Sequence, residues 1–209
     1  MYEINSVHLQ IETKWYQTGM LNKDNDAIIY LPEVIDFVTI SVEISSFLES
    51  EEAISRNEWV DRILKMLPLL YVKASLLPET FPLNDEPPAT FVREEDYVRV
   101  ASRIAATMGE EDIYLDVFVD DMKYSDTPVT ATISEDIADI YQDVRNFVSV
   151  YQFELTGQMQ DAIHVCKENF RLFWGQKLVN VLRPLHALKT SNTEGEEDDE
   201  DQNGEYLWD

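Results

Sequence analysis

The sequence predicts an all-α fold, an antiparallel bundle of about five main helices. Apolar residues recur at the three- and four-residue spacing of a helix face through most of the chain, and the links between these stretches are mostly short. Apolar residues also make up 44% of the 209 residues, which is enough for a packed core in one domain.

The first two helices have clear starts. Pro32 suits a first helical turn, and an apolar stripe follows to about residue 49, made of Phe37, Ile40, Ile44, Phe47 and Leu48. Ser55 and Glu58 have the spacing of a capping box, which marks the start of the second helix. That helix continues as far as Pro78, with an apolar face made of Trp59, Ile63, Met66, Leu67, Leu70, Ala74 and Leu77.

A proline-rich loop, PETFPLNDEPPATF (78–91), precedes the third helix. The third helix stops at Gly109 and has the apolar face Tyr97, Val100, Ala101, Ile104, Ala105 and Met108. Residues 113–133 include the β-rich stretch IYLDVFV and the extended stretch DTPVTATI, so a small extended or hairpin segment is left open there.

Two longer helices are expected in the second half of the chain. The fourth begins near Ser134 and has the apolar stripe Ile137, Ile140, Tyr141, Val144, Phe147, Val148, Tyr151 and Leu155. The fifth is expected from about 158 to 187 as one regular helix, with the stripe Met159, Ala162, Ile163, Cys166, Phe170, Phe173, Val181 and Leu185.

We expect three regions along the chain. Residues 1–26 carry no clean periodicity and are expected to be a weakly structured extension, of which 1–19 need not belong to the native chain. Residues 27–189 form the helical domain. Residues 190–209 contain nine acids and no bases, so a disordered acidic tail is expected. Its cluster Tyr206-Leu207-Trp208 is either an untethered end, which we favour, or a docking motif.

The charge of the chain restricts its partners. Forty-one acidic residues against sixteen basic ones give a net charge of −25, which repels nucleic acid and anionic membranes. The single cysteine, Cys166, suits a reducing compartment, and no apolar run approaches the roughly 20 residues of a membrane span. We therefore expect a cytoplasmic protein without nucleic-acid or membrane partners, and one whose partner, if any, has a basic surface.

Three blocks of the sequence carry a resemblance to a known family. They are LPLLYVKASLLP (67–78), ATISEDIADIYQDVRNF (131–147) and NFRLFWGQKLVNVLRPLH (169–186). These blocks resemble an uncharacterised bacterial family, the domain of unknown function 5063, over about residues 27–188. The resemblance implies a compact helical domain from bacteria and implies no particular activity.

No catalytic, cofactor or metal motif is recognisable. Phosphate-binding glycine loops, C-x-x-C and H-E-x-x-H are all absent from the sequence. Asp161, His164 and Glu168 have a spacing found in di-iron helical bundles, but the helical phase directs them away from the apolar stripe. We therefore expect these three side chains to lie in solvent, with no metal, no cofactor and no catalytic residue.

Two hypotheses on function remain open, and no motif decides between them. The one we favour is an interaction or regulatory module with an acidic surface rather than an enzyme. The alternative is a small-ligand binder or enzyme with a polar pocket between the last two helices, with the candidate ligand-binding residues Lys177, Trp174, Gln176, Arg183 and Asp143. Lys177 lies within the expected apolar stripe, so we expect it to be mostly buried beside a carboxylate from the fourth helix, Asp136 or Asp143.

Overall fold

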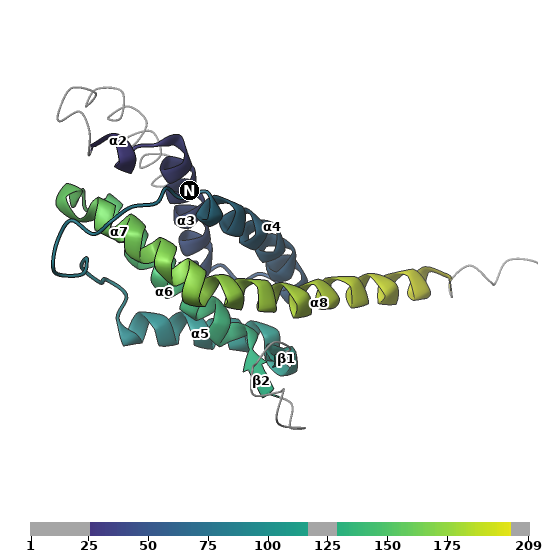
Figure 1. Cartoon of the computed structure of the whole chain (residues 1–209). Helices are drawn as coiled ribbons and strands as arrows, with labels where there is room; N and C mark the ends of the chain where they lie inside the picture. The colour runs from purple at the N-terminus through teal and green to yellow at the C-terminus, as the bar shows by residue number, and fades with distance from the viewer. Residues whose placement is uncertain (1–25, 117–128, 202–209) are drawn as a thin grey trace, which may run out of the picture.

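The fold is a helical bundle with one small β-hairpin (Figure 1). The structure, a computed structural model, describes residues 26–116 and 129–201. The main helices are α3 (Pro32–Glu49), α4 (Arg56–Ser75), α5 (Glu94–Met108), α6 (Ile133–Gln152), α7 (Thr156–Asn169) and α8 (Gly175–Asp201). A short helix, α2 (Asp26–Ile29), precedes them, and the strands β1 (Ile113–Asp116) and β2 (Val129–Thr132) lie between α5 and α6. The all-α prediction is confirmed.

The starts of α3 and α4 and the end of α5 are where the sequence placed them, whereas α4 ends at Ser75, before the expected end at Pro78. Pro32 is the first residue of α3. The Ser55 hydroxyl accepts the backbone N–H of Glu58 at 3.2 Å and caps α4. Gly109 ends α5 with a positive φ of 61°, a backbone conformation that costs glycine little and other residues more.

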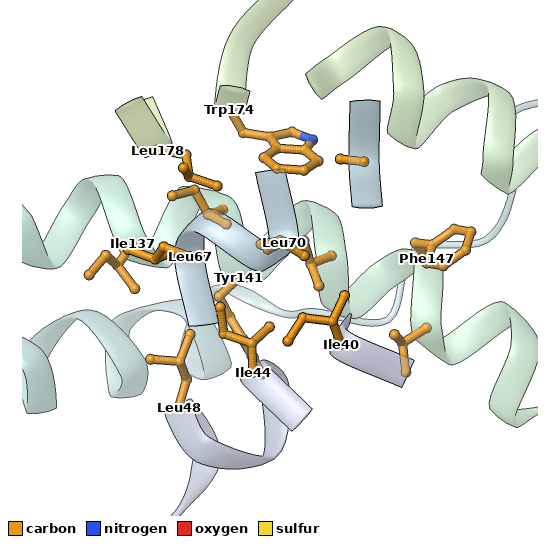
Figure 2. Close-up of a cluster of buried hydrophobic side chains, with 14 of the residues drawn as sticks. Ile40, Ile44, Leu48, Leu67, Leu70, Ile137, Tyr141, Phe147, Trp174 and Leu178 are labelled. Atoms are coloured by element: carbon orange, nitrogen blue, oxygen red, sulfur yellow. The ribbon is translucent and has the colours of Figure 1, made fainter. Parts of the chain in front are cut away.

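Helix α6 is the central helix of the bundle. It packs against α3, α5, α7 and α8, and buried residues occur on most of its circumference. Facing side chains of α3, α4 and α8 complete the core, as Figure 2 shows for Ile40, Ile44, Leu67, Leu70, Ile137, Tyr141, Trp174 and Leu178. The core therefore depends on one helix that is largely enclosed by the others.

The hairpin left open by the sequence is present. Strands β1 and β2 are antiparallel, with Ile113 opposite Thr132 and Asp116 opposite Val129. Just before β1, the buried carboxylate of Asp112 accepts both the backbone N–H of Ser134 at 2.8 Å and the Ser134 hydroxyl at 2.6 Å. The hairpin is thereby joined to the first turn of α6. Residues 117–128, where part of the expected strand falls, lie outside the described residues.

The expected fifth helix from 158 to 187 is not one regular helix. Residues Phe170–Trp174 form a π-helical turn between α7 and α8, in which the Gly175 N–H donates to the Phe170 carbonyl five residues back. The extra residue shifts the apolar stripe by one position. Trp174 and Leu178 are therefore buried, whereas Phe173, which we expected in the stripe, is 46% exposed.

Gly175 is required by this π-helical turn. A Cβ atom at this position would lie 2.3 Å from the Phe170 carbonyl oxygen and 2.9 Å from the Phe170 ring. The pair Trp174-Gly175 is therefore explained by close packing, and that packing lies within the same helical segment. Trp174 itself is fully buried, so the pair does not present a notch to a ligand.

The end of α8 differs from the expected tail boundary at residue 190. The structure continues α8 to Asp201, past the bundle, because consecutive residues of a helix satisfy each other's backbone groups without outside contacts (Figure 1). Residues 1–25 and 202–209 lie outside the described residues, so the extension and the Tyr206–Trp208 cluster stay as sequence-based expectations. Of the helices described, none is long and apolar enough to cross a membrane.

We expect Gly175→Ala to destabilise the domain by about 2 kcal/mol, because the added methyl group forces the Phe170 carbonyl and ring apart. Gly157→Ala is the matched control, since a Cβ at Gly157 of α7 meets no atom within 4 Å. The control variant should be unchanged or stabilised by about 0.5 kcal/mol. Chemical denaturation of the two variants measures both values, and equal stabilities would contradict the role of Gly175.

Candidate interaction site

Lys177 lies in a network of charged and phenolic side chains. Its ammonium nitrogen is 2.7 Å from Asp136 Oδ1 and 2.9 Å from Asp139 Oδ2, both on α6. The second oxygen of Asp136 accepts the Tyr114 hydroxyl of β1, and Asp139 Oδ1 accepts the Tyr97 hydroxyl of α5 at 3.0 Å. The network therefore joins α8, α6, α5 and the hairpin.

The predicted carboxylate partner from the fourth helix is confirmed for Asp136 and wrong for Asp143. Asp143 accepts a hydrogen bond from Asn169 instead. The Lys177 side chain is 26% exposed, so it is less buried than we expected, because the π-helical turn moves it to the margin of the apolar stripe. Its stem passes beside Phe173, whose ring centroid is 5.2 Å from the ammonium nitrogen.

The charges in this network shift the pKa values of two of its members. Partial burial lowers the pKa of Lys177, but the hydrogen bonds to Asp136 and Asp139 outweigh burial, and the net shift is upward. Burial, followed by the nearby charge of Asp139, raises the pKa of Tyr97 well above that of a free phenol. A lysine that holds its proton this firmly acts as a cation and not as a base or nucleophile at neutral pH.

The five candidate ligand-binding residues do not converge on one site. Trp174 is buried in the core and donates its indole N–H to the Cys166 carbonyl at 3.3 Å. Gln176 is exposed and bonds to Asn180, and Arg183 is exposed. Lys177 and Asp143 have the separate partners given above. Because each of these side chains is directed to a different neighbour, the structure does not bring them together as a pocket.

Two of the hollows among the described residues contain none of these five residues. One, of about 270 Å³, lies at the α3–α4 connection and is lined by Trp59, Arg103 and neighbouring residues. The other is an open groove of about 450 Å³ between α4 and α8. Among the described residues, no three His, Cys, Asp or Glu side chains are grouped so that they could hold a metal ion.

The outer face of α7 holds the loop that joins α4 to α5 (residues 76–93, the 76–93 loop). The Asp161 carboxylate, 2% exposed, accepts the backbone N–H of Leu83 at 2.5 Å and the side-chain amide of Asn84. The Gln160 side chain donates to the Phe81 carbonyl at 2.9 Å. These contacts bind the loop backbone to two consecutive residues of one helix.

The same face of α7 contacts the start of the loop. His164 Nδ1 is 2.8 Å from the Thr80 carbonyl oxygen, so Nδ1 carries the proton and donates it. Lys167 donates to the Leu77 carbonyl at 2.7 Å and pairs with Glu79 at 2.6 Å, which lowers the Glu79 pKa. The loop therefore follows α7 over several turns, held by side-chain hydrogen bonds to its backbone.

The expectation that Asp161, His164 and Glu168 lie in solvent is wrong for Asp161 and His164. Asp161 is buried beneath the loop, and His164 is partly covered by it. Helical phase correctly directed both side chains away from the α7 core stripe, but it could not show that a loop distant in sequence covers that face. Glu168, the third residue of the set, forms an ion pair with Arg171, three residues further along the chain.

The consequence of this arrangement is an exposed apolar loop tip (Phe81, Pro82 and Leu83). Because the backbone of this segment is bonded to α7, the side chains of Phe81 and Leu83 point outward, with exposed fractions of 79% and 54%. Residues 76–92 also contain three acids, Glu79, Asp85 and Glu86, and no basic residue. The tip is thus an apolar surface within an acidic surrounding.

Sequence reasoning identified the loop by its prolines but missed its tip. A signal was present, since Phe81 and Leu83 are large apolar residues in a stretch with no periodic partner. Their exposure could not be read without knowing which side of the loop backbone faces the bundle.

Comparison with known proteins identifies the family. The model of the family described as Domain of unknown function (DUF5063) matches residues 28–191, which is more than half of the chain. The chain belongs to this family. The match includes the 76–93 loop, α7 and the whole Lys177 network.

The solved structure of a similar protein supports the fold of this DUF5063 domain. The crystal structure of protein BF1032 from Bacteroides fragilis is 44% identical in sequence and superimposes with a TM-score of 0.69. The similarity covers 78% of this chain and 95% of that one. No curated protein matches the chain. The comparisons therefore establish the family and the helical fold, and they assign no function.

We expect Lys177→Met to lower the free energy of unfolding by about 2 kcal/mol at neutral pH, because Asp136 and Asp139 lose their shared cation while Asp136 stays buried. The loss should shrink in acid, since a protonated carboxyl group needs no cation. In the wild-type protein the raised Lys177 pKa contributes stability below about pH 10.4, and this contribution is lost as the pH rises through the folded-state pKa.

Denaturation across the pH range measures these effects. Adding Asp136→Asn and Asp139→Asn to Lys177→Met is the control and should recover part of the loss, because the uncompensated charges are removed together. Unchanged stability of Lys177→Met would contradict a structural ion network.

We expect Asp161→Ala to release the 76–93 loop without unfolding the bundle. The Leu83 N–H and the Asn84 amide lose their acceptor, at a cost of about 1–3 kcal/mol. Hydrogen exchange at the Leu83 amide should accelerate, and chymotrypsin should cleave after Leu83. Glu168→Ala on the same helix is the control, and exchange at Leu83 that is equal in both variants would show that Asp161 does not hold the loop.

Proposed function

We propose that this DUF5063 domain is a protein-interaction module that presents the loop tip and its acidic surrounding to a partner with a basic surface. The observation that carries this proposal is the burial of Asp161 beneath a loop whose apolar residues Phe81 and Leu83 are exposed. Burying a carboxylate costs free energy, and here the gain is a fixed backbone that holds an aromatic side chain in solvent.

A fixed loop is well suited to binding. Side chains on a loop that is already ordered lose less conformational entropy on association than those on a flexible segment. Aromatic residues that enter a partner's pocket supply much of the energy of many interfaces. Phe81 has this character, and Leu83 adjoins it on the same exposed side.

The charge of the loop indicates the chemistry of the partner. Glu79, Asp85 and Glu86 flank the tip in the sequence of a chain with net charge −25, so a partner with lysine or arginine around an apolar pocket is complementary. Such an interface associates faster at low ionic strength. Cys166 is buried, and burial raises the pKa of its thiol, so it has no role in this binding.

We place the domain in the cytoplasm, where a single free cysteine stays reduced.

The alternative of a small-ligand binder or enzyme receives less support. The candidate residues Lys177, Trp174, Gln176, Arg183 and Asp143 each have other partners or face solvent, and neither hollow contains them. The interaction module is therefore the function that the arrangement of side chains favours.

Site-specific photocrosslinking tests the proposal. The crosslinking amino acid p-benzoylphenylalanine is introduced at position 81, and in a control at position 172, where Leu172 is 72% exposed on the π-helical turn. A covalent crosslink between the domain and a partner protein should form from position 81 and not from position 172. That protein is identified by mass spectrometry, purified and titrated against the domain.

Binding of the purified partner should then weaken about 10-fold or more with Phe81→Ser and stay unchanged with Leu172→Ser. Affinity should also fall as salt concentration rises. Equal crosslinking from both positions, or affinity that does not respond to Phe81→Ser, would refute the loop tip as the binding surface.

A further inference from the structure

The groove between α4 and α8 is lined by apolar and basic residues. The apolar ones are Leu64, Pro68 and Leu182. Lys65, His186 and Lys189 also line it, with a single carboxylate, Asp61, to which both lysines are hydrogen bonded. Two lysines and a histidine against one aspartate make this groove locally cationic, in a chain whose net charge is −25.

Pro68 gives the groove a further binding group. Proline has no N–H, so the carbonyl of Leu64, four residues earlier in α4, lacks the donor it would have in a regular helix. Leu64 and Pro68 both line the groove. A ligand with an N–H donor and an apolar body, next to negative charge, is therefore complementary to it.

Residues 202–209, with the sequence QNGEYLWD, have this chemistry. Tyr206, Leu207 and Trp208 are apolar or aromatic, the indole of Trp208 is an N–H donor, and Glu205 and Asp209 flank the three residues. They follow the acidic end of α8, the helix that forms one wall of the groove.

The distance along the chain permits contact within one molecule. At 1.5 Å per residue, Lys189 lies about 18 Å back along α8 from Asp201. The stretch from residue 202 to Trp208 spans up to about 23 Å when extended. Trp208 can therefore return to the level of Lys189 at the end of the groove.

We infer that the Tyr206–Trp208 cluster docks in the α4–α8 groove of its own chain. Trp208 covers Leu64 at the Lys189 end of the groove, and the acid that follows it, Asp209, lies against Lys65 and Lys189. The tether keeps the local concentration of the segment high, so a modest affinity suffices. The docked segment then closes this groove to other acidic aromatic peptides, independently of the loop tip.

A peptide-binding experiment tests this inference. A fluorescently labelled peptide of residues 202–209 is titrated against the full chain and against a chain shortened to residues 1–201. Shortening leaves the family region, residues 28–191, intact. The peptide should bind the shortened chain at least about 10-fold more tightly than the full chain, in which the tethered segment competes.

Variants locate the contact. Lys65→Glu with Lys189→Glu in the shortened chain should weaken peptide binding at least about 10-fold, and Lys65→Gln with Lys189→Gln replaces this pair if it fails to fold. Arg99→Glu on α5 reverses one charge outside the groove and should have no effect. A peptide with Trp208→Ala should not bind.

Three outcomes would overturn the inference. They are the absence of peptide binding, equal affinity for the shortened and full chains, and affinity that is insensitive to the two lysines. Sedimentation of the full chain distinguishes a second copy as the occupant. Association that depends on Trp208 would place the segment in the groove of another molecule and would also refute docking within one chain.

Discussion

The enclosure of α6 is the constraint on which the rest of the structure depends. A helix that packs against α3, α5, α7 and α8 has little access to water on its packed sides, so each polar side chain buried there requires a partner from a neighbouring element. Asp136 and Asp139 share Lys177 of α8, and Asp143 pairs with Asn169 of α7. These contacts add directional requirements to an apolar core that would otherwise tolerate alternative packings.

The same requirement for hydrogen-bond partners explains the loop on α7. A long connection that lies on a bundle must satisfy its backbone groups, and four prolines reduce the number of N–H groups that need acceptors. Gln160, Asp161 and His164 of α7 supply several of these partners from one helix face. The same contacts hold the loop backbone in place and leave the Phe81 side chain directed outward. The stability of the loop and the exposure of its tip therefore depend on the same hydrogen bonds.

The π-helical turn connects the network and the groove. By adding one residue at Phe170–Trp174, it directs Trp174 and Leu178 into the core and leaves Lys177 at the margin, where it reaches two carboxylates and still contacts water. It also sets the phase of α8 along α4, so that Leu182, His186 and Lys189 face that helix. Gly175 permits this geometry because a side chain at its position would meet the Phe170 carbonyl.

The sequence by itself determined the helical class, the starts of α3 and α4, the end of α5 and the pairing of Lys177 with a carboxylate of α6, since these follow from local capping chemistry, periodicity and the cost of a buried charge. It left open which carboxylate, Asp136 or Asp143. Only the tertiary structure decided what lies over the polar face of α7. The helical phase predicts a solvent-exposed Asp161, because it describes only the residues of α7. The Leu83 N–H that bonds to Asp161 belongs to a loop 78 residues away in the chain. The phase shift at Gly175 was likewise hidden, because a period of 3.6 residues cannot indicate a single inserted residue until the packing partners are known.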